Sequence, residues 1–97
     1  MPSQPNKLPI LQFITKEGGC SLCEEAFEEV ESAKDYVDFE VEIVKLREGD
    51  SDWERYKNDF PVILIDGKFA FRHRTTRDLL IRKLQPKPKW KFWSRNQ

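Results

Sequence analysis

Two short stretches of the chain are apolar at almost every position. They are residues 10–14, with the sequence ILQFI, and residues 62–65, with the sequence VILI. An apolar run of this length, rich in β-branched side chains, is typical of a strand that is buried on both faces. We therefore expect these two strands to lie next to each other at the centre of a sheet.

Two further stretches have the pattern of strands at the edges of that sheet. Residues 39–43 alternate between apolar and acidic side chains, which is the period of a half-exposed strand whose apolar side chains face the core. Residues 68–71 follow the pair Asp66-Gly67, and both members of that pair tolerate the positive φ of a two-residue hairpin turn. We expect this last stretch to return antiparallel to residues 62–65.

The longest helix is expected after Gly18-Gly19, where the apolar period changes to steps of three and four residues. One stripe of this helix is apolar and consists of Cys23, Ala26, Phe27, Val30, Ala33 and Val37. The remaining positions include Glu24, Glu25, Glu28, Glu29 and Glu31. We interpret this acidic face as solvated, with the docking of a basic partner as the alternative.

Two shorter helices complete the pattern. Residues 51–54, with the sequence SDWE, resemble a capping box and predict a short helix to about Asn58. Residues 75–78, with the sequence TTRD, predict the start of a last helix that Pro86 terminates. The predicted order is therefore strand, helix, strand, helix, strand, strand, helix.

This order predicts an α/β fold with a four-stranded mixed sheet and helices on both faces. A strand, a crossover helix and a second strand form a right-handed parallel pair, and the hairpin adds two antiparallel strands. A chain of 97 residues forms one domain. We divide it into an N-terminal extension (residues 1–7), the domain itself (residues 8–85) and a C-terminal tail (residues 86–97).

Charge and composition remove several classes of protein from consideration. Lysines and arginines number 17, as do aspartates and glutamates, so the net charge does not indicate a nucleic-acid partner. No apolar run is long enough to cross a bilayer, and residues 1–7 lack the pattern of a secretory signal. We expect a cytoplasmic protein, or one of another reducing intracellular compartment. There, two cysteines three positions apart indicate redox or metal chemistry.

The cysteine pair is the clearest candidate for chemistry. The motif Cys20-Ser21-Leu22-Cys23 follows the first central strand and opens the long helix, and Pro61 precedes the second central strand. With these motifs in this order, residues 8–85 resemble the glutaredoxins of the thioredoxin-fold superfamily. The resemblance is greatest to short glutaredoxin-like proteins with a Cys-x-Leu-Cys site. It implies a thioredoxin-like fold and thiol–disulfide oxidoreductase activity.

The position of the two cysteines suits a redox dithiol. Residues three apart on the first turn of a helix have Cα atoms about 5–6 Å apart, which a disulfide can close. A helix N-terminus stabilises a thiolate, so we expect Cys20 to attack a substrate disulfide and the more buried Cys23 to resolve the mixed disulfide. Lys16 favours the Cys20 thiolate, whereas acidic neighbours oppose it. The alternative is a pair of ordinary reduced cysteines on a buried helix.

The resemblance assigns a second part of the site to Phe60 and Pro61. It implies that the peptide bond between them is cis, that Pro61 packs against the reactive sulfurs, and that the backbone of Phe60 pairs with the substrate as a short added strand. Without the resemblance, a trans proline at the start of a strand is the ordinary expectation.

The chain departs from the glutaredoxin pattern at two places. Glutaredoxins commonly have a proline after the first cysteine and an aromatic residue before the second, where this chain has Ser21 and Leu22. They usually carry Gly-Gly before the last helix, where this chain has Arg72-His73-Arg74. The loss of the glycines crowds the approach of glutathione to the backbone. His73 is not assigned as a general base. A candidate anion site, or else a solvated strand end, remains beside that helix, formed by Arg72, Arg74, Thr75 and Thr76.

No metal site is expected within one chain. Two cysteines and one distant histidine cannot complete a tetrahedral zinc site. Some glutaredoxins share an iron–sulfur cluster between two subunits with glutathione as an additional ligand, and such a bridging cluster is a third interpretation of this chain. We otherwise expect no bound cofactor, with glutathione as a candidate co-substrate.

The C-terminal tail interleaves basic and aromatic side chains, and its Pro-Lys repeats argue against a continued helix. This composition suits an anionic membrane surface or single-stranded nucleic acid. The plainer interpretations are aromatic side chains that fold back over an apolar patch, or no fixed structure at all. We expect no nucleic-acid partner.

These observations predict a small, monomeric thiol–disulfide oxidoreductase that reduces protein disulfides or glutathione mixed disulfides. Its electrons come from an external reductant, glutathione or a thioredoxin-type reductase, because the sequence contains no flavin or nicotinamide site. The alternative function belongs to another class: a non-catalytic thioredoxin-like adaptor that binds a partner through its edge strand or its basic tail.

Overall fold

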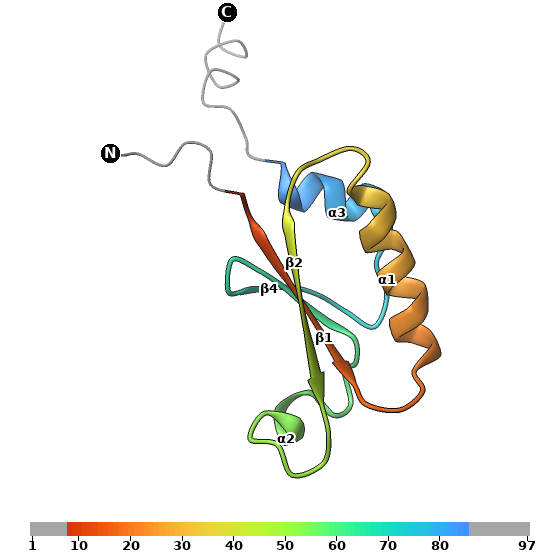
Figure 1. Cartoon of the computed structure of the whole chain (residues 1–97), viewed down its shortest axis with the longest axis vertical. Coiled ribbons are helices and arrows are strands. Elements are labelled where there is room, and N and C mark those ends of the chain that lie inside the picture. Colours follow the sequence, from red (N-terminus) through yellow and green to blue (C-terminus); the bar gives the residue numbers. More distant parts are fainter. Residues whose placement is uncertain (1–7, 86–97) are drawn as a thin grey trace, which may run out of the picture.

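The computed structural model of the protein describes residues 8–85. These residues form four strands and three helices in the predicted order (Figure 1). The expectations for residues 1–7 and 86–97, including the role of Pro86, concern segments outside the described residues. The elements are β1 (Ile10–Lys16), α1 (Ser21–Ala33), β2 (Glu40–Leu46), α2 (Trp53–Tyr56), β3 (Val62–Ile65), β4 (Lys68–Arg72) and α3 (Arg77–Leu84).

The four strands form one mixed sheet in the order β2-β1-β3-β4. β1 runs parallel to β2 and antiparallel to β3, and β4 runs antiparallel to β3. The two continuous apolar stretches therefore occupy the two central positions, which confirms the prediction from their pattern. Their interior side chains are excluded from water, since Leu11 on β1 is 0% exposed and Ile63 on β3 is 1% exposed.

α1 and α3 lie side by side on one side of the sheet (Figure 1). Phe27 of α1 packs edge-on against Phe13 of β1, with ring centroids 5.2 Å apart. Val30 of α1 and Leu80 of α3 are fully buried in the same core. The burial of each such aliphatic side chain contributes about 1.5–3 kcal/mol, so this layer fixes α1 and the cysteines at its amino end. None of the helices in residues 8–85 is long and apolar enough to cross a membrane.

α2 is a single turn and is shorter than the predicted helix. It begins after Asp52, and no side chain caps it, so the predicted capping box does not form. Asp50 provides the reason, because its carbonyl oxygen accepts a hydrogen bond from the N–H of Trp53 at 3.0 Å while its carboxylate accepts one from the N–H of Arg47 at 2.9 Å. The loop therefore closes as a series of turns. α2 lies beyond the end of β2, away from α1 and α3 (Figure 1).

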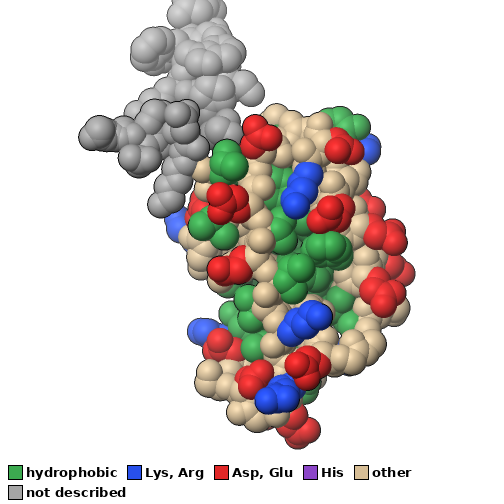
Figure 2. Space-filling view, in the orientation of Figure 1, with side chains coloured by type: hydrophobic (Ala, Val, Ile, Leu, Met, Phe, Trp, Pro, Cys, Tyr) green, Lys and Arg blue, Asp and Glu red, His purple; other side chains and the backbone are tan. Residues whose placement is uncertain are grey.

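The edge strand β2 is more open than its alternating sequence predicts. Ile43 is 51% exposed, although it pairs in register with the buried Phe13 of β1. The α1 side chain Phe27 reaches β1 at Phe13, and the neighbouring edge strand remains uncovered there. Hydrophobic side chains are accordingly visible between β2 and α1 on the face shown in Figure 2. α1 itself ends at Ala33, before Val37, since the next residues form turns.

The hairpin between β3 and β4 has the predicted two-residue turn. Asp66 and Gly67 have φ values of 51° and 82°, so both adopt the left-handed conformation that this turn requires. The register between the two strands shifts between Ile63 and Leu64. Residues 73–76 join β4 to α3, and His73 of this segment lines the same pocket as Cys20.

Candidate functional site

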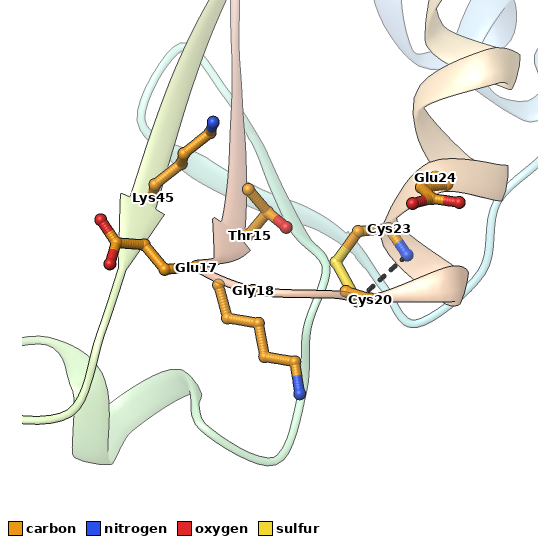
Figure 3. Close-up of a pocket in the computed structure, with 8 residues that line it drawn as sticks. Thr15, Glu17, Gly18, Cys20, Cys23, Glu24 and Lys45 are labelled. Atoms are coloured by element: carbon orange, nitrogen blue, oxygen red, sulfur yellow. Dashed lines mark hydrogen bonds between the residues drawn. A yellow bond between two sulfur atoms is a disulfide. The ribbon is translucent and has the colours of Figure 1, made fainter.

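Cys20 and Cys23 form a disulfide at the amino end of α1, with Cα atoms 5.2 Å apart (Figure 3). This distance agrees with the spacing expected for the first turn of a helix. The chain reaches the site from β1 through Gly18, whose φ of 88° lies in the region that favours glycine. The end of a central strand and the start of a buried helix thus fix both sulfurs.

The two sulfurs lie in different environments. Cys20 is the N-cap residue of α1, and its Sγ accepts a hydrogen bond from the N–H of Cys23 at 3.2 Å (Figure 3). The side chain of Cys23 belongs to the core and is only 5% exposed, whereas Cys20 is half-buried and lines surface pockets. Cys20 is therefore the more accessible of the two to an incoming sulfur atom, although Cys23 also lines one of these pockets.

Cys20 lies between two pockets. The first has a volume of about 390 Å³ and adjoins the carboxyl ends of β1 and β2 (Figure 3). The second has a volume of about 400 Å³ and brings Cys20 together with Phe60 and His73. Lys16 lines both pockets, so the structure places this predicted neighbour beside the cysteine pair. The first pocket is lined by Thr15, Lys16, Glu17, Gly18, Cys20, Cys23, Glu24 and Lys45.

The Phe60–Pro61 peptide bond is cis, as the resemblance implies. Phe60 is buried, and its ring packs against that of Trp53 with centroids 5.5 Å apart. Pro61 is fully buried, and its carbonyl oxygen accepts a hydrogen bond from the N–H of His73 at 2.9 Å. Within residues 8–85, no backbone hydrogen bond uses the N–H or the carbonyl group of Phe60. Phe60 lines the second pocket together with Cys20.

A third pocket, with a volume of about 300 Å³, adjoins the second pocket, because Leu22 and His73 line both. It lies between α1 and the start of α3. Its lining brings together three of the predicted substrate-binding residues, Arg74, Thr75 and Thr76, and adds two glutamates of α1 that the sequence pattern did not single out. These glutamates are Glu25 and Glu29.

The predicted anion site consists of groups that already have partners. Arg72 lies 3.8 Å from a carboxylate oxygen of Asp59, and Arg74 lies 3.5 Å from one of Glu25. The ring of His73 lies 3.6 Å from the same Asp59 oxygen. Arg72 lines neither the second nor the third pocket, so the structure separates it from the other predicted residues.

Glu29 is the residue of this region that the sequence pattern least indicated. The acidic face of α1 was interpreted as solvated, and acidic side chains do gather along the edge of the molecule that α1 forms (Figure 2). Glu29 instead turns toward α3, where its carboxylate accepts a hydrogen bond from the N–H of Arg77 at 2.7 Å. The signal in the sequence was its place at the border of the apolar stripe, next to Val30.

The two lysines that line the second pocket differ in whether a carboxylate pairs with their charge. The ammonium group of Lys57, which lines the second pocket, lies 2.8 Å from a carboxylate oxygen of Glu54. This hydrogen bond, together with the charge of the carboxylate, raises the pKa of Lys57 above its ordinary value of 10.5. Lys16 forms no ion pair within residues 8–85. Its positive charge therefore acts on Cys20 without a paired carboxylate.

Metal ligands do not gather in the part of the chain that the structure describes. Among residues 8–85, no group of three or more His, Cys, Asp or Glu side chains is arranged to hold a metal ion. The interpretation as a carrier of a bridging iron–sulfur cluster depends on a second subunit and on glutathione, and it stays a prediction.

Two solved structures share this architecture. A thioredoxin-2, described as a component of malaria parasite protein secretion machinery, superposes with a TM-score of 0.55 over 78% of this chain and 80% of its own, at 16% sequence identity. A second structure, described as that of a malarial protein, gives a TM-score of 0.55 over 82% of this chain and 100% of its own, also at 16% identity. Identities this low establish a shared fold alone.

Sequence comparisons go further than the fold. The "Glutaredoxin-like protein YDR286C homolog" of Dictyostelium discoideum is 36% identical over an alignment of 77 residues, and the match covers 72% of this chain and 69% of the relative. The family described as "Glutaredoxin-like domain (DUF836)" matches residues 10–85, from the first residue of β1 to the residue after α3. The resemblance that the cysteine motif and Pro61 suggested is thus confirmed. This chain belongs to the glutaredoxin-like (DUF836) family of thioredoxin-fold proteins.

Proposed function

We propose that this protein is a thiol–disulfide oxidoreductase that reduces protein disulfides or glutathione mixed disulfides through Cys20 and Cys23. The observation that carries the proposal is the hydrogen bond from the N–H of Cys23 to Sγ of the half-buried Cys20 at the N-cap of α1. Donors at a helix N-terminus stabilise a thiolate relative to a thiol. In the reduced protein, the same N–H group is available to the nucleophilic sulfur.

The reaction consists of two thiol–disulfide exchanges. The Cys20 thiolate attacks one sulfur of the substrate disulfide, that S–S bond breaks, and the other substrate sulfur leaves as a thiolate that takes a proton from water. The Cys23 thiolate then attacks Sγ of Cys20, breaks the mixed disulfide and releases the second substrate thiolate. The substrate gains two electrons, and the dithiol loses two. An external thiol or dithiol reduces the Cys20–Cys23 disulfide again.

The burial of Cys23 suits it to the second exchange only. Its side chain lies in the core, so a large substrate cannot reach it, yet Cys20 is within disulfide distance. An intramolecular attack of this kind has a high effective concentration, because both sulfurs are fixed on one helical turn. The mixed disulfide on Cys20 is therefore expected to be short-lived.

The backbone beside Pro61 supports the docking of an extended substrate. The N–H and carbonyl groups of Phe60 have no backbone partner within residues 8–85, and Phe60 lines the pocket that contains Cys20. A peptide that adds itself there as a short strand would satisfy both groups and present its cysteine to Cys20.

The experiment is a single-turnover reduction with no reductase present. The protein is reduced, freed of reductant and mixed with one equivalent of a peptide disulfide, and the products are trapped by acid and weighed by mass spectrometry. We expect the wild-type protein to reduce one disulfide and to end as the intramolecular Cys20–Cys23 disulfide. The C23S variant is expected to stop at a mixed disulfide on Cys20.

The matched variant C20S retains Cys23, and we expect it to react at least about tenfold more slowly, because its remaining thiol is buried. The proposal fails if both thiols of the wild-type protein stay free, or if the adduct forms on Cys23. In that event the alternative function, a non-catalytic adaptor that tolerates serine at both cysteines, would account for the fold.

A further inference from the structure

The amino end of α3 has two of its first four N–H groups occupied by the chain itself. Glu29 accepts a hydrogen bond from the N–H of Arg77 at 2.7 Å. Oγ1 of Thr76 accepts one from Leu79 at 3.3 Å, and the carbonyl oxygen of Thr76 accepts one from Leu80 at 3.0 Å. The first four N–H groups of a helix have no partner within the helix's own regular bonding. Of these four groups in α3, those of Arg77 and Leu79 have partners, whereas none is found within residues 8–85 for those of Thr76 and Asp78.

The cations around this helix end are also paired. Arg74 lies 3.5 Å from Glu25, and the guanidinium group of Arg77 lies 3.6 Å from Asp78. Glu25 and Glu29 of α1 line the adjoining pocket. Its charged side chains therefore include two carboxylates, and its arginine, Arg74, is the one that pairs with Glu25. Glu29 therefore occupies, from inside the protein, one of the N–H groups with which this helix end would otherwise attract an anion.

We propose that Glu29 is a specificity-determining residue that directs the cysteine site away from glutathione and toward polypeptide cysteines with an apolar neighbour. This inference rests on the proposed function and narrows its substrate class. Glutathione carries two carboxylates, and one that approached the N–H of Arg77 would meet the carboxylate of Glu29 at hydrogen-bond distance from the same donor. Two like charges this close repel strongly at the partly desolvated surface of a protein.

The rest of the third pocket suits an apolar side chain. Its apolar lining consists of the half-buried Leu22 from α1 and of Leu79 from α3, which is 44% exposed, over the buried Ala26. Leu22 also lines the pocket that contains Cys20, so the apolar surface continues toward the reactive sulfur. An apolar residue next to a substrate cysteine would remove this surface from water, which favours its binding. A carboxylate in the same place would have to compete with Glu25 for Arg74, the arginine that lines this pocket in the described part of the chain.

The test compares three mixed disulfides of one reporter peptide in the single-turnover reduction. The first contains glutathione, the second contains glutathione with both carboxyl groups amidated, and the third contains the amidated tripeptide acetyl-Leu-Cys-Leu. We expect the wild-type protein to reduce the second and third at least about tenfold faster than the first, because like-charge repulsion acts on the first alone. The variant E29Q keeps an acceptor for Arg77 and removes the charge, so it is expected to narrow that ratio severalfold.

The control variant is E28Q, which removes the same charge from an exposed neighbouring position of α1. It is expected to retain the wild-type ratio. The inference is overturned if the wild-type protein reduces the glutathione and diamide substrates at equal rates, or if E28Q changes the ratio as much as E29Q does. In either case the proposed function stands, since reduction has occurred.

A binding measurement decides the inference even if no substrate is reduced and the proposed function fails. S-methylglutathione is titrated into the wild-type protein and into E29A, and the amide resonances of Arg77 and Leu79 are followed by NMR. We expect a saturable shift in E29A at concentrations that leave the wild-type resonances unchanged. Equal dissociation constants for the two proteins would overturn the role of Glu29.

Discussion

Nε2 of His73 lies 3.1 Å from the carbonyl oxygen of Asn58, and this contact joins the end of β4 to the loop that leads into the cis Phe60–Pro61 bond. His73 adopts a φ of 66°, in the left-handed region that favours glycine. Glutaredoxins usually carry glycines in this region. The backbone conformation thus suits glycine while the residue is a histidine, whose ring fastens two segments that border the Cys20 pocket.

Substitutions at His73 separate the backbone from the side chain. H73G and H73A both remove the imidazole contact, but alanine keeps a Cβ atom at a positive φ whereas glycine does not. We expect H73A to be less stable than H73G by about 0.5–1 kcal/mol, after the greater freedom of glycine in the unfolded chain is taken into account. Urea denaturation of the two variants measures the difference. Equal stabilities would show that the left-handed conformation is relaxed or absent in solution.

The N-cap function of Cys20 is testable without the disulfide. C20S and C20A both prevent the cross-link, so it does not contribute to the difference between them. Serine keeps an acceptor for the N–H of Cys23, and alanine leaves that donor without one. We expect C20A to be about 1 kcal/mol less stable than C20S. The measurement is guanidinium denaturation followed by circular dichroism at 222 nm, and identical midpoints would contradict the capping role.

Lys16 is expected to raise the reactivity of Cys20 through its charge. In a C23S background, where Cys20 is the one remaining thiol, K16Q should slow alkylation by the neutral reagent iodoacetamide about two- to fivefold at low ionic strength. The effect should diminish in 1 M NaCl, because the Debye length then falls to about 3 Å.

The control for Lys16 is K34Q, which removes the same charge beyond the opposite end of α1. The 13-residue helix places that charge about 20 Å away, where its Coulomb interaction with Cys20 through water is weak even at low ionic strength. A rate for K16Q that equals the rate for K34Q would remove Lys16 from the site.

The central part of the fold could be predicted because its signals are local. The continuous apolar runs in β1 and β3 leave no polar face for water, so their central position follows from the sequence. The pair Asp66-Gly67 selects its turn through the two φ values that it tolerates. The cis bond before Pro61, in contrast, follows from the resemblance and not from the residues alone, since most X–Pro bonds are trans.

The remaining features depend on neighbours that are distant in the sequence. Ile43 alternates like a buried residue, but its exposure is decided by where α1 crosses the sheet. Glu29 belongs to a run of acidic residues, and its role is visible only once α3 lies beside α1. The partners of Arg72 and Arg74 are likewise carboxylates from other elements. Candidate residues could therefore be identified from the sequence, while their pairing required the structure.

The two adjacent leucines at the start of α3 separate stability from substrate recognition. Leu80 is fully buried against the core, whereas Leu79 lines the third pocket. We expect L80A to lower the free energy of unfolding by about 2–5 kcal/mol, the usual cost of removing a buried leucine side chain.

For L79A we expect a loss of less than about 1 kcal/mol, because water already reaches this side chain in the folded protein. Its effect should appear in the chemistry, where kcat/KM for a peptide disulfide with apolar flanking residues falls severalfold while that for a glycine-flanked peptide changes little. L79A removes part of the apolar wall of the third pocket, so it should affect only a peptide that uses this wall. An equal fall in kcat/KM for both peptides would instead show that Leu79 orders the site as a whole. A fall confined to the apolar peptide would locate the substrate's flanking side chain between α1 and α3.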